Sequence, residues 1–102
     1  MRAAGWNNGA WHKSGAGYGI RIDKEDRAHF FRETWPDVRV ELPSGVATKV
    51  RISKSFWKKC PELRSQDVGR WMIEVGLARW KNGTPPVLKL EPVGGQVFRL
   101  AR

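Results

Sequence analysis

Catalysis needs titratable side chains that converge on one point, and this chain offers few. His12 lies in a glycine-rich stretch and His29 lies in a predicted helix. A histidine without a partner group more often has a structural role than the role of a base. Cys60 has no second cysteine to pair with and no base close to it in the sequence. These residues predict a protein without enzymatic activity of its own.

Two further patterns could bind a cofactor. Asp23, Glu25 and Asp26 could hold a divalent cation, but they open a predicted helix, where carboxylates cap free N–H groups and offset the helix dipole. The stretch Gly15-Ala16-Gly17-Tyr18-Gly19 has the composition of a phosphate loop. A dinucleotide fingerprint, however, follows a strand and opens a helix, whereas this stretch precedes a strand. We therefore predict no metal ion and no cofactor.

Composition limits the class of protein. The 102 residues include 19 Lys and Arg against 10 Asp and Glu, a net charge of +9, with 40% hydrophobic and 11% aromatic residues. This content supports a folded core, and the positive charge calls for an anionic partner. A single cysteine excludes a disulfide scaffold and favours the reducing cytoplasm or nucleus. No apolar run reaches the ~20 residues of a membrane span, no signal peptide is recognisable, and no basic amphipathic helix suggests a membrane partner.

The positive charge is concentrated in two segments without acidic residues. One runs from Met1 to Ile22 and the other lies between Glu41 and Glu62. Both combine cations with aromatic residues, as surfaces that follow phosphates and stack on bases do. A solvated basic surface is the ordinary alternative. We predict nucleic acid as the partner, duplex DNA first; an RNA or single-strand binder, a small nuclease or toxin-like enzyme, and a structural subunit are the alternatives.

The elements that position these cations follow from the hydrophobic pattern. Residues 1–17 have no period and predict a flexible glycine-rich N-terminal arm, and residues 18–102 form one domain. Alternation predicts strands over 18–22, 38–42, 48–53, 87–91 and 97–100. Helical spacing predicts helices over 23–35, ended by Pro36, and over 67–77, with Trp35 and Trp71 in the core. A helix followed by a hairpin thus occurs twice.

These two helix-hairpin repeats predict the fold class. Neither repeat can bury its apolar faces alone, so we expect an α+β fold in which both hairpins and the first strand form a small β pseudobarrel with two helices at its open ends. An open α+β sandwich is the alternative.

Five stretches resemble a known family in the same order along the chain. They are Gly19 to Phe31, Val38 to Leu42 with Gly45, Lys49 to Trp57, Val68 to Leu77 and Val87 to Leu100. They are similar to the plant B-three DNA-binding domain, a DNA-binding pseudobarrel that also occurs as the effector domain of some restriction endonucleases. The resemblance implies that two segments grip the major groove. We name Lys13, Ser14 and residues 18–21 the first binding segment, and residues 51–59 the second.

These segments coincide with the two acid-free stretches. The predicted DNA contacts are Lys13, Ser14, Tyr18, Arg21, Lys49, Arg51, Lys54, Ser55, Trp57, Lys58 and Lys59. Because the chain lacks a catalytic set, we expect it to act alone as a repressor-like blocker or beside a catalytic partner protein.

Overall fold

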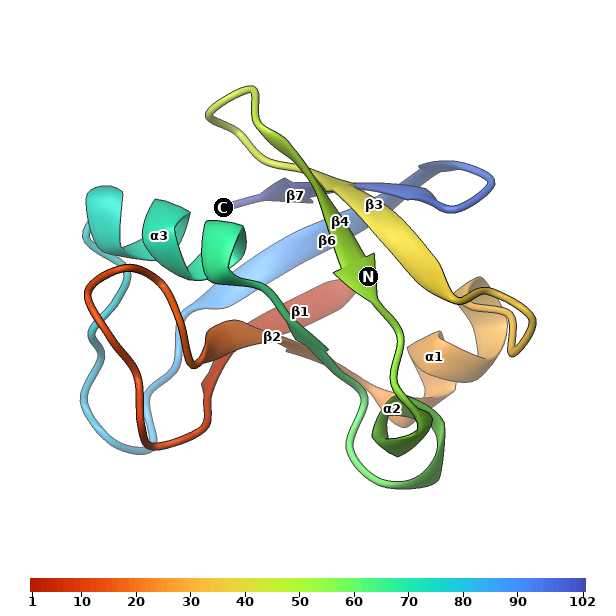
Figure 1. The fold of residues 1–102 in the computed structure, drawn as a ribbon, viewed down its shortest axis with the longest axis horizontal. Coiled ribbons are helices and arrows are strands. Elements are labelled where there is room, and N and C mark those ends of the chain that lie inside the picture. The colour runs from red at the N-terminus through yellow and green to blue at the C-terminus, as the bar shows by residue number, and fades with distance from the viewer.

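The computed structural model describes all residues from 1 to 102 and contains seven strands and three helices (Figure 1). Their order is β1 (Arg2–Asn7), β2 (Tyr18–Ile22), α1 (Lys24–Phe30), β3 (Asp37–Glu41), β4 (Ala47–Arg51), α2 (Lys54–Lys58), β5 (Glu62–Arg64), α3 (Gln66–Glu74), β6 (Val87–Gly94) and β7 (Val97–Ala101). The predicted α+β class is confirmed. None of the helices has the length and apolar composition needed to cross a membrane.

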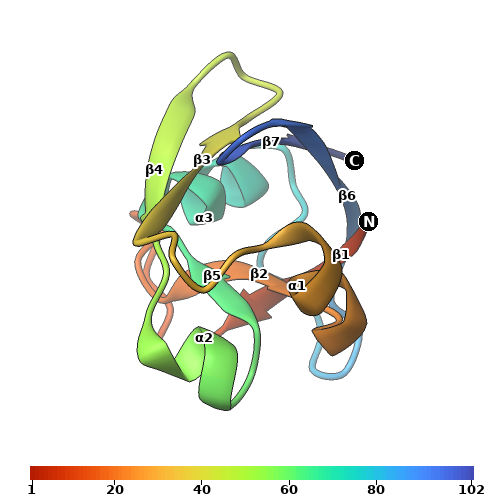
Figure 2. The same ribbon diagram turned by 90° about the vertical axis from the view of Figure 1, so that its right-hand side faces the viewer.

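All seven strands belong to one mixed sheet, in the order β4-β3-β7-β6-β1-β2-β5. The predicted hairpins are present as the antiparallel pairs β3–β4 and β6–β7, and the parallel pair β3–β7 joins them. Figure 2 shows that the sheet curls around the interior. Its end strands, β4 and β5, contact each other but do not pair, so the sheet does not close into a hydrogen-bonded barrel.

The predicted N-terminal arm is wrong for residues 2–7, which form β1 between β6 and β2. Ala3 and Gly5 face the interior, and Arg2, Ala4 and Trp6 alternate with them on the outer face. Alternation is therefore present in this strand. It is hard to detect in the sequence because the inward positions hold an alanine and a glycine instead of large apolar residues.

The number of helices also differs from the prediction, because α2 occurs in addition to α1 and α3. Its turn buries Phe56 completely. The first helix ends at Phe30, five residues before Trp35, because the backbone of Phe31 is extended. This turn places the Phe31 ring in the core, where it stacks on Phe98 at 4.7 Å between ring centroids. Burial of one aromatic ring therefore overrides the helical spacing that the sequence shows.

The core lies inside the curled sheet and under α3. Strand residues point alternately inward and outward, as Val38 and Val40 do in β3, and Trp71 and Met72 close the core from α3. The predicted core role of Trp71 is confirmed, and Trp35 is only partly buried against this core. Because the interior takes the apolar residues, the cations of every strand lie on the outer face of the sheet.

Candidate nucleic-acid interface

The second binding segment presents cations that have no partner. β4 ends in Arg51, and the α2 turn and its C-terminal cap carry Lys54, Lys58 and Lys59. Burial of Phe56 orients this turn, and all four cationic side chains are exposed. None of the four forms an ion pair with a carboxylate. Their charge is therefore free to interact with an anionic ligand.

Arg27 of α1 adds a fixed cation beside this turn. Its Nη1 donates a hydrogen bond to the carbonyl oxygen of Phe56 at 2.7 Å, and its guanidinium lies 5.7 Å from the ring centroid of Trp57. Trp57 is half-buried, packs edge-on against Phe56, and has its indole Nε1 buried without a hydrogen bond. Trp57 therefore packs α2 against the body of the protein.

Two other predicted contacts of this region are partly engaged. The hydroxyl of Ser55 shares a hydrogen bond with that of Ser53 at 2.8 Å. Lys49 Nζ lies 3.6 Å from a carboxylate oxygen of Asp37 on the neighbouring strand. Lys49 remains largely exposed, so Asp37 reduces the positive potential around it but leaves the ammonium group accessible on the surface.

The first binding segment is engaged within the protein itself. Lys13 is exposed, but the Ser14 hydroxyl lies 2.9 Å from His12 Nδ1 within hydrogen-bond distance. Tyr18 is only 2% exposed and packs against Trp11 and Trp80 at 6.4 and 5.6 Å between ring centroids. Its burial raises the pKa of the phenol, and the nearby charge of Arg79 opposes that rise.

The prediction that Tyr18 contacts DNA therefore needs correction, because its side chain belongs to the core. It heads β2, where the odd-even alternation of the strand turns it inward together with Ile20 and Ile22. The free energy gained by burying the aromatic ring exceeds the free energy lost by removing one hydroxyl from water. The tyrosine positions the loop from 8 to 17 and is not accessible to a ligand.

Close backbone approach fixes that loop against α3. Gly15, at φ +97°, lies so near to Gly69 of α3 that a Cβ on Gly69 would collide with the carbonyl of Gly15 and approach the Cβ of Tyr18 to 2.6 Å. Only two residues without side chains permit this distance. The loop is thus held by packing, and Lys13 is carried on a fixed surface.

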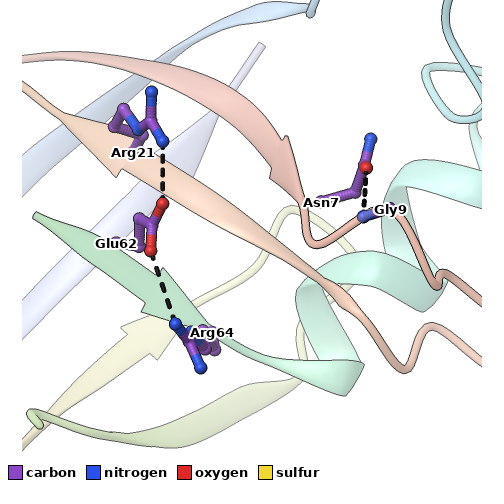
Figure 3. A network of polar contacts seen from close by, with 5 residues as sticks. All are labelled: Asn7, Gly9, Arg21, Glu62 and Arg64. Carbon is purple, nitrogen blue, oxygen red and sulfur yellow. Dashed lines mark hydrogen bonds and ion pairs between the residues drawn. The ribbon is translucent and has the colours of Figure 1, made fainter. Parts of the chain in front are cut away.

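Arg21 belongs to a polar network on the outer face of β2 and β5 (Figure 3). Its Nη2 donates to Glu62 Oε2 at 2.7 Å, and Glu62 Oε1 lies 3.6 Å from Arg64 Nη2. The Arg64 guanidinium also lies over the ring of Trp6 on β1, 5.1 Å from its centroid. One carboxylate thus holds two arginines, which leaves a net positive charge on this face.

Glu62, Arg64 and Trp6 are absent from the sequence-based set of contacts. The signal that could reveal them is the triplet Glu62-Leu63-Arg64, in which a buried leucine separates two polar residues. A three-residue strand gives too short a pattern to recognise. The pairing of β5 with β2 cannot be predicted from the sequence of either strand alone.

The two binding segments lie at opposite ends of this arginine face. Lys13 and Ser14 precede Tyr18, at the start of β2, whereas the N–H of Ile22, at its end, donates to the Pro61 carbonyl just after α2. The five residues of β2 span about 17 Å. Figure 1 shows the 8–17 loop on the left of the molecule and α2 below and to its right. The two segments are therefore separated by the length of β2, and their cations do not converge on one point.

The structure contains no group of three or more His, Cys, Asp or Glu side chains placed to hold a metal ion, and Cys60 is exposed and free. Comparison with protein-family models, curated proteins and solved structures finds no significant match to this chain. The basis for a function is therefore the surface itself, which carries exposed lysines on α2 and exposed arginines on β2 and β5.

Proposed function

We propose that this chain is a non-catalytic module that binds double-stranded DNA and that its curled sheet is a DNA-binding pseudobarrel. The observation that carries the proposal is the set of exposed, unpaired cations of the second binding segment, Arg51, Lys54, Lys58 and Lys59. A surface of free cations releases counterions from phosphates on binding, which is the main source of affinity for nucleic acid.

The distribution of aromatic side chains favours duplex over single-stranded ligands. Proteins that bind single strands offer exposed aromatic rings on which successive bases stack. Here Trp11 is the one large aromatic side chain that is exposed, at 39%, and Arg79 covers it with its guanidinium 4.8 Å from the ring centroid. The surface therefore offers phosphates many cations and offers unstacked bases little, which fits a base-paired ligand.

The resemblance to the B-three domain supports the same ligand, since the segments that it assigns to the major groove include the unpaired cations. In this proposal the two segments contribute unequally to binding. The second binding segment supplies free charge, and the first supplies Lys13 together with the paired Arg21.

A charge-reversal pair tests the proposal. Arg51→Glu with Lys58→Glu is expected to abolish binding to a labelled random-sequence duplex, measured by fluorescence anisotropy, without a change in melting temperature, because both side chains are exposed. Lys89→Glu with Arg102→Glu is the matched control, since it makes the same charge change at two other exposed, unpaired positions. Duplex binding at the wild-type level by the first pair would mean that the segment is only a solvated surface.

The same titration distinguishes the competing functions. Single-stranded DNA and RNA are titrated beside the duplex at two salt concentrations, and preference for either would favour the single-strand or RNA alternative. Incubation with labelled duplex and Mg²⁺ tests the non-catalytic part. Cleavage that is lost on Glu25→Ala or His12→Ala would instead support the nuclease alternative.

A further inference from the structure

We propose that Arg64 reads guanine in the major groove of the bound duplex and that Glu62 and Trp6 hold it in position for this task. The inference rests on the proposed function, because it names the base that the same surface recognises.

Arg64 is the one cation of the structure that has both an aromatic ring and a carboxylate as partners. Its guanidinium is covered by the Trp6 ring at 5.1 Å and attracted by Glu62 at 3.6 Å, yet its side chain is 65% exposed. It donates none of the side-chain hydrogen bonds of the structure. Its N–H groups are therefore open to a ligand while the plane of the group is restrained.

Arg21 has the complementary role in this network (Figure 3). It donates a hydrogen bond of 2.7 Å to Glu62, whose side chain is only 11% exposed. A carboxylate so enclosed and paired has little freedom to rotate, so it is a firm support for the second arginine. Arg21 thus fixes Glu62, and Glu62 together with Trp6 fixes Arg64.

The strand register explains why these residues meet. Trp6, Gly19 and Arg64 lie opposite one another across β1, β2 and β5. Gly19 has no side chain between the other two, and a Cβ there would collide with the backbone carbonyl of Leu63. The glycine therefore allows both the close approach of β5 and the stacking of Arg64 on Trp6.

Guanine is the base that this arrangement fits best. It presents O6 and N7 as two acceptors side by side in the major groove, and the fork of a guanidinium matches them with two parallel hydrogen bonds. Arginine that is already held by stacking and an ion pair loses less side-chain entropy on binding. The lysines of α2 have no ring or carboxylate that restrains them, so they suit phosphate contacts, which carry no sequence information.

Selection from a pool of random duplexes is the first experiment, with wild type and Arg64→Lys compared. Wild type is expected to enrich guanine at one or more positions, whereas the lysine variant keeps its charge and salt dependence but loses the preference at one position. An unchanged guanine preference in Arg64→Lys, or no base preference in wild type, would overturn the inference. Absence of any duplex binding by wild type would instead overturn the proposed function.

Modified bases in the selected duplex give the second experiment. Replacing the selected guanine by 7-deazaguanine removes N7 and with it one of the two hydrogen bonds. We expect wild type to bind that duplex about 5- to 10-fold more weakly, the lower part of the range for a whole bidentate contact. Arg64→Lys should show little of this penalty. Inosine keeps O6 and N7 and should bind like guanine, so a penalty for inosine alone would place the reading in the minor groove and contradict the inference.

The supporting residues are tested by the same penalty. Glu62→Gln is expected to shrink the 7-deazaguanine penalty while binding to a duplex without guanine at that position stays at or above the wild-type level. A mutation that merely weakened the fold would lower both affinities. An undiminished penalty in Glu62→Gln would show that the carboxylate does not position Arg64.

Discussion

The two binding segments look alike in the sequence and differ in the folded protein. In the first, Tyr18 is buried, Ser14 contacts His12, and Arg21 is paired with Glu62. In the second, Arg51 and the lysines of and next to α2 are exposed and have no acidic partner. One segment is thus a restrained surface with directed donors, and the other is a source of unrestrained charge.

The difference teaches that an acid-free stretch of sequence is not an acid-free region of space. Glu62 lies 41 residues from Arg21 in the chain and reaches it through the pairing of β2 with β5. The cations of the second segment on α2 gain no such acidic partner, because α2 lies outside the sheet. It connects β4 and β5, the two end strands of the sheet. Free charge supports affinity, and fixed charge can support sequence recognition.

The largest expected effect comes from removing the anchor of the second segment. Phe56 is fully buried and packs against Phe31 at 5.1 Å between centroids, so Phe56→Ala should lower the free energy of unfolding by about 3–5 kcal/mol. Urea denaturation followed by tryptophan fluorescence measures it. Val46→Ala, at a side chain that is 49% exposed, is the control and should change little. A loss below about 1 kcal/mol at Phe56 would show that α2 is not anchored there.

The packing of the first segment gives the next largest effect. Gly69→Ala improves helix propensity but places a Cβ against the carbonyl of Gly15 and the Cβ of Tyr18, so we expect a net destabilisation of about 1–3 kcal/mol. The thermal melting temperature reports it. Glu74→Ala, at an exposed side chain in the last turn of the same helix, should be nearly neutral. A stabilised Gly69→Ala would mean that the loop from 8 to 17 is free to move away from α3.

A smaller effect is expected from the ion pair of Arg21, which distinguishes the first segment from the unpaired second one. A double-mutant cycle with Arg21→Gln and Glu62→Gln should give a coupling energy of about 0.5–1 kcal/mol, because Arg21 is half exposed and solvent screens the pair. The same cycle with Arg51→Gln and Glu62→Gln should give none, since no ion pair joins those residues. Equal coupling in the two cycles would remove the distinction between the segments.

The smallest expected effect is a shift in the ionisation of Tyr18, which is not observable at neutral pH. Tyr18 is the only tyrosine, so its ionisation can be followed by absorbance at 295 nm without ambiguity. Burial raises its pKa above the ordinary value of 10.0, so the stability that this difference contributes is complete below pH 10 and is lost as the pH rises through the folded-state pKa.

Arg79→Gln should raise the pKa of Tyr18 further, because it removes the charge that favours the phenolate. In urea the midpoint should return to about 10, the value of an exposed tyrosine. A folded-state midpoint at or below 10.0 would contradict the burial of the first segment.

Elements with large alternating side chains could be predicted from the sequence. Strand β2 and both hairpins follow from valine, isoleucine and leucine at every second position, and α3 follows from Val68, Trp71 and Met72. Strand β1 does not follow from the sequence, because Ala3 and Gly5 carry little hydrophobic signal. Helix α2 and strand β5, with five and three residues, are too short to show a period.

The candidate site divides in the same way. Exposure of the second-segment cations follows from their own positions, since charged side chains stay in water unless something pairs them. Burial of Tyr18 follows from the alternation of β2, which puts it on the same face as Ile20 and Ile22. The arginine network was not predictable, because it depends on which strands become neighbours. Register between β1, β2 and β5 is a property of the whole sheet and is not contained in any one stretch of residues.

The position of β1 between β2 and β6 has a consequence for co-translational folding. One side of this strand pairs with β2, close by in the chain, but the other pairs Arg2 with Lys89 and Ala4 with Val87. During synthesis the edge of β1 that faces β6 therefore stays unpaired until residues 87–89 have been made. An unpaired edge is open to pairing with a neighbouring chain, and long-range strand closure is slow. Nascent chains halted before residue 87 should accordingly remain protease-sensitive and bind chaperones, and folding should complete only after translation releases β6.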